Sequence, residues 1–303
     1  MSLIIVIVDL EEFKVKTRII SGVIIALVVG AVLSLGFLVN PLIITAAVAI
    51  LAAIAVYELI HNAAGIKCKA SIIGAIFYSV FVVFILDKTL LQILLKWIGA
   101  SELLEINYIG AIIQNEAVII LSVFYFVYAV CMVLKNNKEF GLGAIISLCA
   151  MPLILSYAFS SLSNVINFEQ DGIYYLLMMF NFASVCDMGA YFVGSAMGKT
   201  KLCPNVSPKK TVEGAFGGII SSMIVSAILS AVFSKDIMMA IILTIPFCVI
   251  GMLGDLFASA IKRSVDLKDY GSLIPGHGGI LDRLDSMLLI APVFYIVILS
   301  GVI

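Results

Sequence analysis

Charged side chains are scarce in this sequence. Asp, Glu, Lys and Arg make up 12% of the 303 residues, whereas 63% are hydrophobic and the mean hydropathy is +1.20. Because soluble domains carry about 25% charged residues, the composition excludes an ordinary soluble domain and predicts a polytopic membrane protein. The net charge of −1 says little about partners, so the distribution of charge along the chain matters more.

Several motifs of other protein classes are also lacking. The six cysteines are scattered without a CxxC pair or a partner histidine, which favours small apolar packing residues in a reduced compartment. The opening MSLIIVIVD is too short to span a membrane, is followed by acids and lacks a basic start, so a signal peptide is not indicated. No internal repeat is evident.

Long apolar runs dominate what is present. A helix needs about 20 apolar residues to cross a bilayer, and nine runs of that order cover residues 18–38, 41–62, 71–87, 110–134, 141–161, 173–197, 213–233, 237–262 and 284–302. We therefore expect an all-α integral membrane protein with about nine transmembrane helices. Residues 88–98 are too short and too charged to span, and predict an interfacial amphipathic helix with Trp97 at headgroup depth.

The spans predict three regions of the chain. They are residues 1–107 with about three spans and the interfacial helix, 108–165 with two spans, and 166–303 with about four spans. We expect the last region to hold a polar cavity that faces the cytoplasm.

Lysine and arginine residues predict the orientation. If the N-terminus lies on the first side, that side collects Lys14, Lys16, Arg18, Lys67, Lys69, Lys135, Lys138, Lys199, Lys201, Lys209, Lys210, Lys262, Arg263, Lys268 and Arg283, and the other side only Lys88, Lys96 and Lys235. This split of 15 to 3 places the first side in the cytoplasm, because cytoplasmic loops carry the excess of basic residues. The polar loops 198–212 and 263–283 then both face the cytoplasm.

Ionisable residues inside predicted spans are costly and favour function. Asp187 lies well inside the sixth span, where a carboxylate must be paired, protonated or bound to a cation. Glu58 and His61 near the end of the second span, and Glu116 in the fourth, could instead simply reach the interface.

The loop after Asp187 combines small residues and lysines. Gly189, Gly194 and Gly198 have the spacing of tight helix packing. The segment 207–218, SPKKTVEGAFGG, places Lys209 and Lys210 just before a predicted helix with Thr211 as its N-cap. Such a site can bind a phosphate or the headgroups of anionic lipids, and the residues leave both open.

The most polar stretch of the chain is 259–285, SAIKRSVDLKDYGSLIPGHGGILDRLD. Asp282 and Asp285 are three apart at the start of the last span, so both point to one face if that turn is helical. Together with Asp255 they form a candidate oxygen-ligand set for Mg²⁺. The turn 275–279 has backbone N–H groups that can approach an anion, and His277 is a candidate phosphate contact.

These residues resemble a known family. The pattern Ser259-x-Ile261-Lys262-Arg263, four residues, Lys268-Asp269-x-Gly271, then Ile274-Pro275-x-His277-Gly278-Gly279-Ile280-x-Asp282-Arg283-Leu284-Asp285 resembles the signature of phosphatidate cytidylyltransferases, or CDP-diacylglycerol synthases. The upstream run from Asp187 through Lys199 and Ser207 to Gly214 resembles the second block of that family. The strong resemblance covers about the last 120 residues, and Tyr57-Glu58 is a weaker local match.

The resemblance implies the reaction of CTP with phosphatidate to give CDP-diacylglycerol and pyrophosphate at the cell membrane. It also implies Mg²⁺ dependence, a homodimer and no nucleic-acid partner, and it raises a second, monovalent cation that the sequence leaves open. The candidate catalytic residues are Lys262, Arg263, Lys268, Asp282, Arg283 and Asp285. The candidate substrate-binding residues are Asp187, Ser207, Lys209, Lys210, Thr211, His277, Gly278 and Gly279, and the candidate metal ligands are Asp255, Asp282 and Asp285.

Two other functions stay open at this stage. A transporter or channel would also suit several spans with intramembrane carboxylates, although transport sites tend to lie near the midplane in repeat-related helices. An enzyme of the same class could act on another lipid phosphate, such as an isoprenoid-ether analogue or a polyprenol phosphate.

Overall fold

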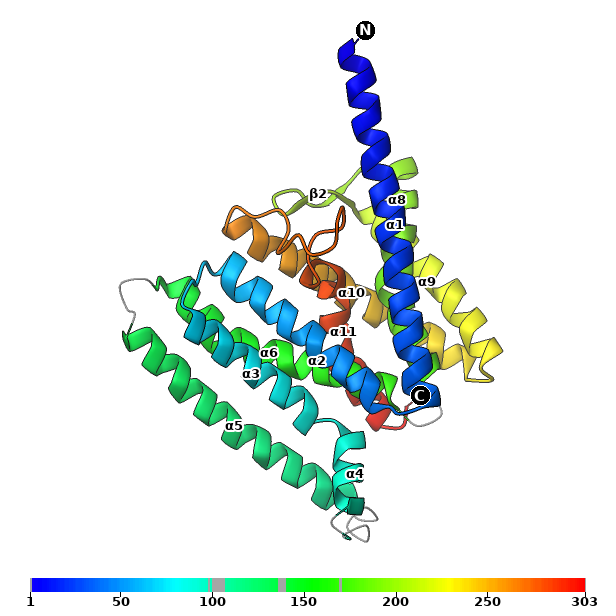
Figure 1. Ribbon diagram of the computed structural model, residues 1–303. Coiled ribbons are helices and arrows are strands. Elements are labelled where there is room, and N and C mark those ends of the chain that lie inside the picture. Colours follow the sequence, from blue (N-terminus) through cyan, green and yellow to red (C-terminus); the bar gives the residue numbers. More distant parts are fainter. Residues whose placement is uncertain (1, 98, 100–106, 136–139, 169–170, 303) are drawn as a thin grey trace.

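The protein is a bundle of helices (Figure 1). Its structure is a computed structural model that describes residues 2–97, 99, 107–135, 140–168 and 171–302; the side chains of residues 2–18, 92, 94, 95 and 107–113 lie outside the description. The orientation residues Lys14, Lys16, Arg18 and Lys138 therefore lie outside the described side chains. The integral membrane class predicted from composition is confirmed.

The helices follow the apolar runs closely. In chain order they are α1 (Ser2–Leu38), α2 (Leu42–Tyr57), the π-helix η1 (Glu58–Ala63), α3 (Lys69–Ile85), α4 (Lys88–Trp97), α5 (Asn107–Lys135), α6 (Leu142–Ile166), α7 (Gly172–Phe180), the π-helix η3 (Asn181–Val185), α8 (Cys186–Met197), α9 (Val212–Val232), α10 (Ile237–Ser264) and α11 (Leu281–Leu299). Each predicted span overlaps one of these helices or, for 173–197, the continuous run from α7 to α8. Hydropathy alone therefore placed the spans to within a few residues.

Among the described residues, not all nine predicted spans form helices of the length and hydropathy needed to cross a membrane. Within the described residues, seven helices are long and apolar enough to cross a membrane. The two remaining runs form α3, which has 17 residues, and α11, which carries three charged residues in its first turns. Nine spans thus stay a prediction.

The termini of several helices follow from their sequences. Thr211 caps α9 as predicted, because its hydroxyl oxygen accepts a hydrogen bond from the Gly214 amide at 3.1 Å. Asp236 caps α10 in the same way through the Met239 amide at 3.0 Å. Lys262 and Arg263 lie in the last turn of α10, where cations suit the negative end of the helix dipole.

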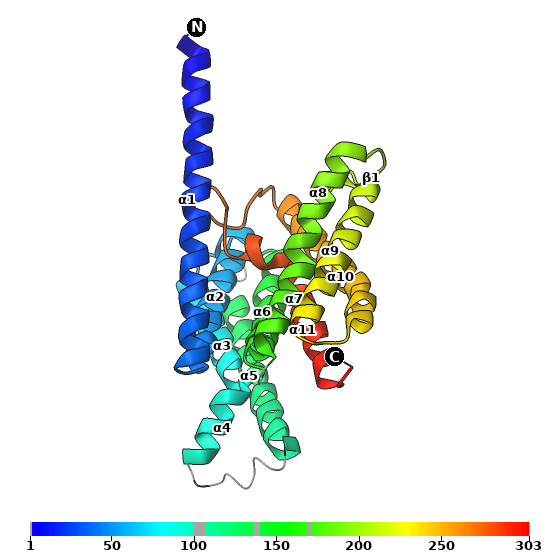
Figure 2. The same cartoon turned by 90° about the vertical axis from the view of Figure 1, so that its right-hand side faces the viewer.

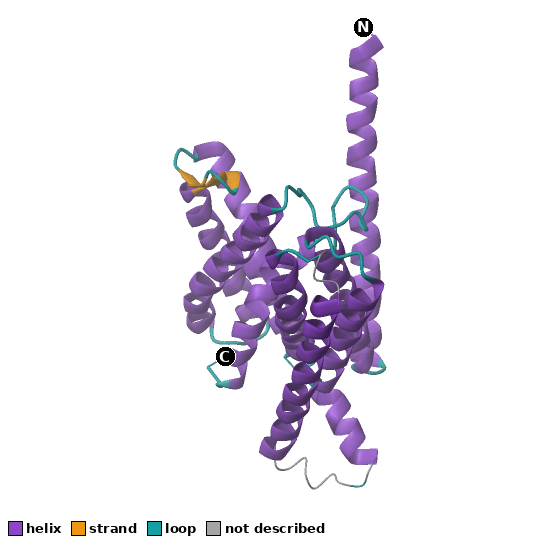
Figure 3. Cartoon of the chain, turned by 90° about the vertical axis from the view of Figure 1, so that its left-hand side faces the viewer, coloured by secondary structure: helices purple, strands orange, loops and turns teal. Residues whose placement is uncertain are grey.

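A short antiparallel hairpin forms the one β-sheet among the described residues. It consists of β1 (Lys201–Cys203) and β2 (Ser207–Thr211), which pair antiparallel and lead directly into α9. Figure 3 shows this hairpin in orange at one end of the bundle, beside the ends of its neighbouring helices. The sequence analysis placed these residues in a loop and missed the pairing, because strands of three and five residues leave too few positions for alternation to be recognised.

The two polar loops lie at the same end of the bundle. The β1–β2 hairpin and residues 265–280 are found at the end towards which the N-terminal half of α1 projects, whereas α4 and the C-terminus lie at the other end (Figures 1 and 2). This arrangement agrees with the predicted alternation of sides. Residues 2–16, whose conformation the sequence left open, continue α1 as one straight helix.

The C-terminal half is held together by a buried aromatic cluster. The rings of Phe182, Phe247 and Phe294 meet with centroids 5.1 to 5.5 Å apart, stacked or edge-on, and join η3, α10 and α11. Asn181 donates hydrogen bonds to the Ser222 carbonyl and the Ser226 hydroxyl, which ties η3 to α9. These contacts position the helices that carry the candidate site residues.

Candidate active site

Five candidate substrate-binding residues line one cavity. It has a volume of about 490 Å³ and lies between α8, the β1–β2 hairpin and α9; Asp187, Ser207, Lys209, Lys210 and Thr211 contribute to its wall. Both lysines belong to β2 of the hairpin, where Lys209 is exposed and Lys210 is partly buried. The structure thus brings together the residues that the sequence placed in a span and in the following loop.

Lys210 links two intramembrane carboxylates at this cavity. Its ammonium forms ion pairs with Asp255 of α10 and, at 3.5 Å, with Asp187 of α8. Burial lowers the pKa of Lys210, but the two carboxylates together outweigh burial and raise the pKa above its ordinary value. Of the possibilities that the sequence left open for Asp187, the structure shows pairing, with Lys210 as the partner that it shares with Asp255.

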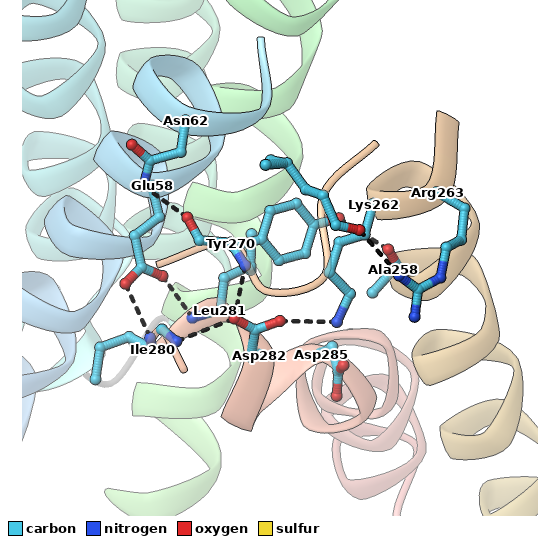
Figure 4. Close-up of polar contacts among 12 residues, drawn as sticks. Glu58, Asn62, Ala258, Lys262, Arg263, Tyr270, Ile280, Leu281, Asp282 and Asp285 are labelled. Carbon is cyan, nitrogen blue, oxygen red and sulfur yellow. Dashed lines mark hydrogen bonds and ion pairs between the residues drawn. The ribbon is translucent and has the colours of Figure 1, made fainter. Parts of the chain in front are cut away.

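Asp282 organises the loop before α11 (Figure 4). Its Oδ1 accepts a hydrogen bond from the Lys262 ammonium at 2.7 Å, and its Oδ2 accepts bonds from the amides of Tyr270 at 2.7 Å and Gly279 at 3.0 Å. The side chains of Lys262 and Asp282 are 10% and 2% exposed. The Lys262 ammonium also lies 5.3 Å from the centre of the Tyr270 ring.

Asp285 lies on α11 where this helix approaches α10. It is partly buried, its Oδ1 accepts a hydrogen bond from the Ser286 amide at 2.7 Å, and it interacts electrostatically with Asp255, Lys262 and Asp187. Helices α10 and α11 approach closely here, since a Cβ on Gly254 would lie 2.9 Å from the Asp285 carbonyl oxygen. The Asp285 carboxylate therefore lies beside the close contact of α10 and α11.

The predicted set of metal ligands is only partly assembled. Among the described residues, no group of three or more His, Cys, Asp or Glu side chains forms a metal-binding cluster. Asp255 is paired with Lys210 and Asp282 with Lys262. Both carboxylate oxygens of Asp282 are therefore occupied, one by the Lys262 ammonium and the other by two backbone amides of the loop.

The remaining candidates lie around the loop. Arg263, Lys268 and Arg283 are exposed, and Arg263 donates a hydrogen bond to the Leu267 carbonyl at 3.1 Å. His277 shares a hydrogen bond of 2.9 Å with Ser21 of α1. Gly276 and Gly278 have φ values of +79° and +85°, which form the tight turn that the sequence predicted. The Gly279 amide, a predicted anion contact, binds Asp282 instead.

Two residues of a distant span hold this loop, a role that the sequence did not predict for them. Glu58 of η1 is buried and accepts hydrogen bonds from the amides of Ile280 and Leu281, and Asn62 donates to the Tyr270 carbonyl at 2.6 Å. A carboxylate in an apolar run was visible, but the π-helical turn that aims it across the bundle was not. Such turns often occur at functional sites.

Comparisons with known proteins agree with the resemblance. The model of the cytidylyltransferase family matches residues 16–300. The chain is 38% identical over 166 residues to a phosphatidate cytidylyltransferase of Bacillus subtilis (strain 168), which covers 54% of this chain and 61% of that protein. It is 41% identical over 134 residues to one from Staphylococcus haemolyticus, covering 44% of this chain and 52% of that protein.

A third relative is matched over more of its length. A phosphatidate cytidylyltransferase of Staphylococcus epidermidis is 34% identical over 193 residues, which cover 62% of this chain and 71% of that protein. The matched part thus spans between about half and seven tenths of these three relatives.

Proposed function

The chain belongs to the cytidylyltransferase family, and from that membership we propose that it is a phosphatidate cytidylyltransferase. In this reaction CTP and phosphatidate give CDP-diacylglycerol and pyrophosphate, a step of phospholipid biosynthesis. We also propose that the protein lies in the cell membrane with the hairpin and loop 265–280 in the cytoplasm, and that it forms a homodimer.

The cationic cavity beside the hairpin is the observation that carries this proposal. Lys209 and Lys210 line it at the end of the bundle, next to Asp187 and within reach of the charges of α10 and α11. Two phosphate-bearing substrates need such a concentration of positive charge, because a dianion has to approach a polyanionic triphosphate. We assign the lysines and Ser207 to substrate phosphates, with Thr211 shaping the wall as the cap of α9.

An apolar groove next to the cavity suits the lipid substrate. It has a volume of about 430 Å³ between α9 and α10, and shares Leu202, Ala215 and Met252 with the lining of the cavity. A lipid phosphate could reach the lysines while its acyl chains stay among the apolar residues of the groove. This continuity supports a membrane lipid as the acceptor.

The proposed reaction does not need a side chain of the protein to deprotonate the nucleophile. The second pKa of a phosphate monoester is near 6, so the phosphate of phosphatidate is largely dianionic at neutral pH. One of its oxygens attacks the α-phosphorus of CTP, the bond to the bridging oxygen breaks, and pyrophosphate leaves. Catalysis then rests on positioning and on neutralising negative charge, for which we assign Lys262, Arg263, Lys268 and Arg283, with His277 as a phosphate contact.

The carboxylates of α10 and α11 are the candidate ligands for Mg²⁺. Mg²⁺ takes oxygen ligands and is often held by one or two carboxylates together with substrate phosphates. We assign that role to Asp255 and Asp285, which lie on helices α10 and α11 beside their close contact. Asp255 would bind the metal only if Lys210 released it, and Asp282 would join only if Lys262 released it. When bound, the metal would offset the charge of the triphosphate and of the leaving pyrophosphate.

A reconstituted assay tests the function. The purified protein is incubated with CTP, phosphatidate and Mg²⁺, and pyrophosphate and CDP-diacylglycerol are measured. Matched reactions omit the lipid or Mg²⁺, or contain a polyprenol phosphate or an isoprenoid-ether analogue in place of phosphatidate.

We expect pyrophosphate and CDP-diacylglycerol only when CTP, phosphatidate and Mg²⁺ are all present. Turnover with another lipid phosphate alone would change the substrate and keep the enzyme class. The absence of pyrophosphate with every lipid would overturn the proposal and favour a transporter.

A further inference from the structure

Glu58 holds the first turn of α11 from the other half of the chain. It lies in η1, more than 220 positions before α11, and its Oε1 and Oε2 accept hydrogen bonds from the amides of Ile280 at 3.1 Å and Leu281 at 3.0 Å (Figure 4). The residue is 3% exposed. A carboxylate at the N-terminus of a helix satisfies amides that have no partner within the helix and interacts favourably with the helix dipole.

Two glycines of the loop make room for this carboxylate. A Cβ on Gly271 would lie 2.4 Å from Glu58 Oε1, and a Cβ on Gly279 would lie 2.4 Å from Glu58 Oε2. The carboxylate cannot swing aside without breaking its two hydrogen bonds. The backbone before the turn at 275–279 and at its last residue therefore closes around Glu58.

The contacts of Glu58 lie next to those of the charged pair. The Gly279 amide, one residue before the first amide bound by Glu58, donates to Asp282, which in turn binds Lys262. Asn62, one turn after Glu58, holds the carbonyl of Tyr270, whose amide also donates to Asp282. The π-helix η1 thus fixes the loop at two points, Tyr270 and the pair Ile280–Leu281, next to the two amides that bind Asp282.

We infer that Glu58 is a positioning residue of the transfer site, which sets the register of α11 and thereby the placement of the Lys262–Asp282 pair and of Asp285. This role rests on the proposed function, because the groups it positions are those assigned to the substrates. It also explains why a carboxylate is buried in a span at this point: an apolar residue would leave both helix amides without an acceptor.

Kinetics of matched variants test the role. Glu58→Gln keeps the size but turns an NH₂ group towards one of the two amides, and Gly279→Ala adds the methyl group that collides with the carboxylate. We expect each variant to lower kcat about 10-fold or more, with the KM values for CTP and phosphatidate changed less than about 3-fold, since small displacements of catalytic groups cost rate. Tyr57→Phe, on the exposed neighbour of Glu58, is the control with unchanged kcat.

The double variant Glu58→Asp/Gly279→Ala makes the test specific. The shorter aspartate leaves room for the alanine methyl group, so we expect the double variant to be more active than Gly279→Ala alone. If Glu58 contributes only to stability, the variants will have lower Tm values but a wild-type kcat for the folded fraction, which would overturn the inference. Equal kcat for the double variant and Gly279→Ala would also contradict it.

Hydrogen exchange separates this inference from the proposed function. In the intact protein in nanodiscs, we expect Glu58→Gln to speed exchange in peptides that contain Tyr270, Ile280 and Leu281, with the hairpin 201–211 unchanged. If the wild-type protein does not convert CTP and phosphatidate, the proposed function fails while the exchange result still decides whether Glu58 fixes the loop. Unchanged exchange and unchanged kcat in Glu58→Gln would overturn the inference.

Discussion

Lys210 and Lys209 are neighbours in sequence with different surroundings. Both line the cavity, but Lys209 is exposed whereas Lys210 is partly buried between the carboxylates of Asp187 and Asp255. The sequence predicted two equivalent cations near a helix N-terminus. The antiparallel pairing of β2 with β1 decides which of them turns inwards, because alternate residues of a strand point to opposite sides.

Substitution of these lysines by methionine should separate their roles. We expect Lys210→Met to lower kcat by about 100-fold or more, because Asp187 and Asp255 lose their counter-charge at the cavity. Lys209→Met should mainly raise the KM of one substrate. Steady-state kinetics with both substrates measures this difference, and equal effects of the two substitutions would contradict the geometry.

The raised pKa of Lys210 predicts a pH dependence of stability. Because the folded state raises the pKa above its ordinary value, the stabilisation is fully present below the pKa of the unfolded chain and is lost as pH rises through the folded pKa. The difference in Tm between wild type and Lys210→Met should therefore be constant from about pH 7 to 10 and shrink above about pH 10.4. Thermal unfolding in detergent across this range checks the sign, which a difference that grows above pH 10.4 would contradict.

Asp282 and Asp285 look equivalent in sequence and differ in their contacts. Asp282 binds an ammonium and two amides, whereas the contact of Asp285 is with the adjacent Ser286. We expect Asp285→Asn to abolish activity and leave Tm nearly unchanged. Asp282→Asn should nearly abolish activity as well, and in addition destabilise the protein by about 3 kcal/mol, since Lys262 is left without its partner.

Activity at increasing Mg²⁺ and thermal unfolding measure both substitutions. A fully active Asp285→Asn variant with the Mg²⁺ dependence of the wild type would remove Asp285 from the proposed metal ligands. An Asp282→Asn variant as stable as the wild type would contradict the organising role of Asp282 in the loop.

Helices α8 and α9 pack closely through small residues. A Cβ on Gly218 of α9 would lie 2.4 Å from the Cys186 carbonyl of α8, and a Cβ on Gly189 would lie 2.6 Å from the Ser221 hydroxyl. The spacing of glycines 189, 194 and 198 had predicted this packing, and the structure confirms it. The close approach places Asp187 and the hairpin on two walls of the same cavity.

Alanine at Gly218 should force these helices apart. Backbone atoms cannot yield, so we expect Gly218→Ala to destabilise the protein by about 1–3 kcal/mol and to lower activity. Gly143→Ala in α6 is the matched control, because a Cβ there has no atom within 4 Å. Thermal unfolding of both variants checks this, and equal Tm values would contradict the packing.

A buried polar cluster at the other end of the bundle was not anticipated. Asp87, 1% exposed, accepts hydrogen bonds from Thr45 of α2, the Leu90 amide of α4 and Ser163 of α6. In the sequence Asp87 is only the end of a short apolar run. Its partners come from three helices and meet only when the bundle forms, so periodicity could not reveal them.

At the scale of the whole molecule, the charge split predicts the sides of the membrane. The hairpin and α4 lie at opposite ends of the bundle (Figure 1). In intact cells, a membrane-impermeant maleimide should therefore label Lys96→Cys but not Lys209→Cys. After the membrane is opened, both variants should be labelled. Labelling of the parent protein gives the background from its native cysteines. Labelling of Lys209→Cys in intact cells would reverse the proposed orientation.

Local sequence determined the spans, the Thr211 cap and the glycine spacing, because hydropathy, capping and small-residue packing depend on neighbours within a few turns. It also determined which stretch, 259–285, carries the signature charges. Only the tertiary structure decided the partners: Lys210 with Asp187 and Asp255, Lys262 with Asp282, and Glu58 with the start of α11. Opposite charges are abundant in both polar loops, and which of them meet depends on how the helices pack and on a π-helical turn that no local pattern encodes.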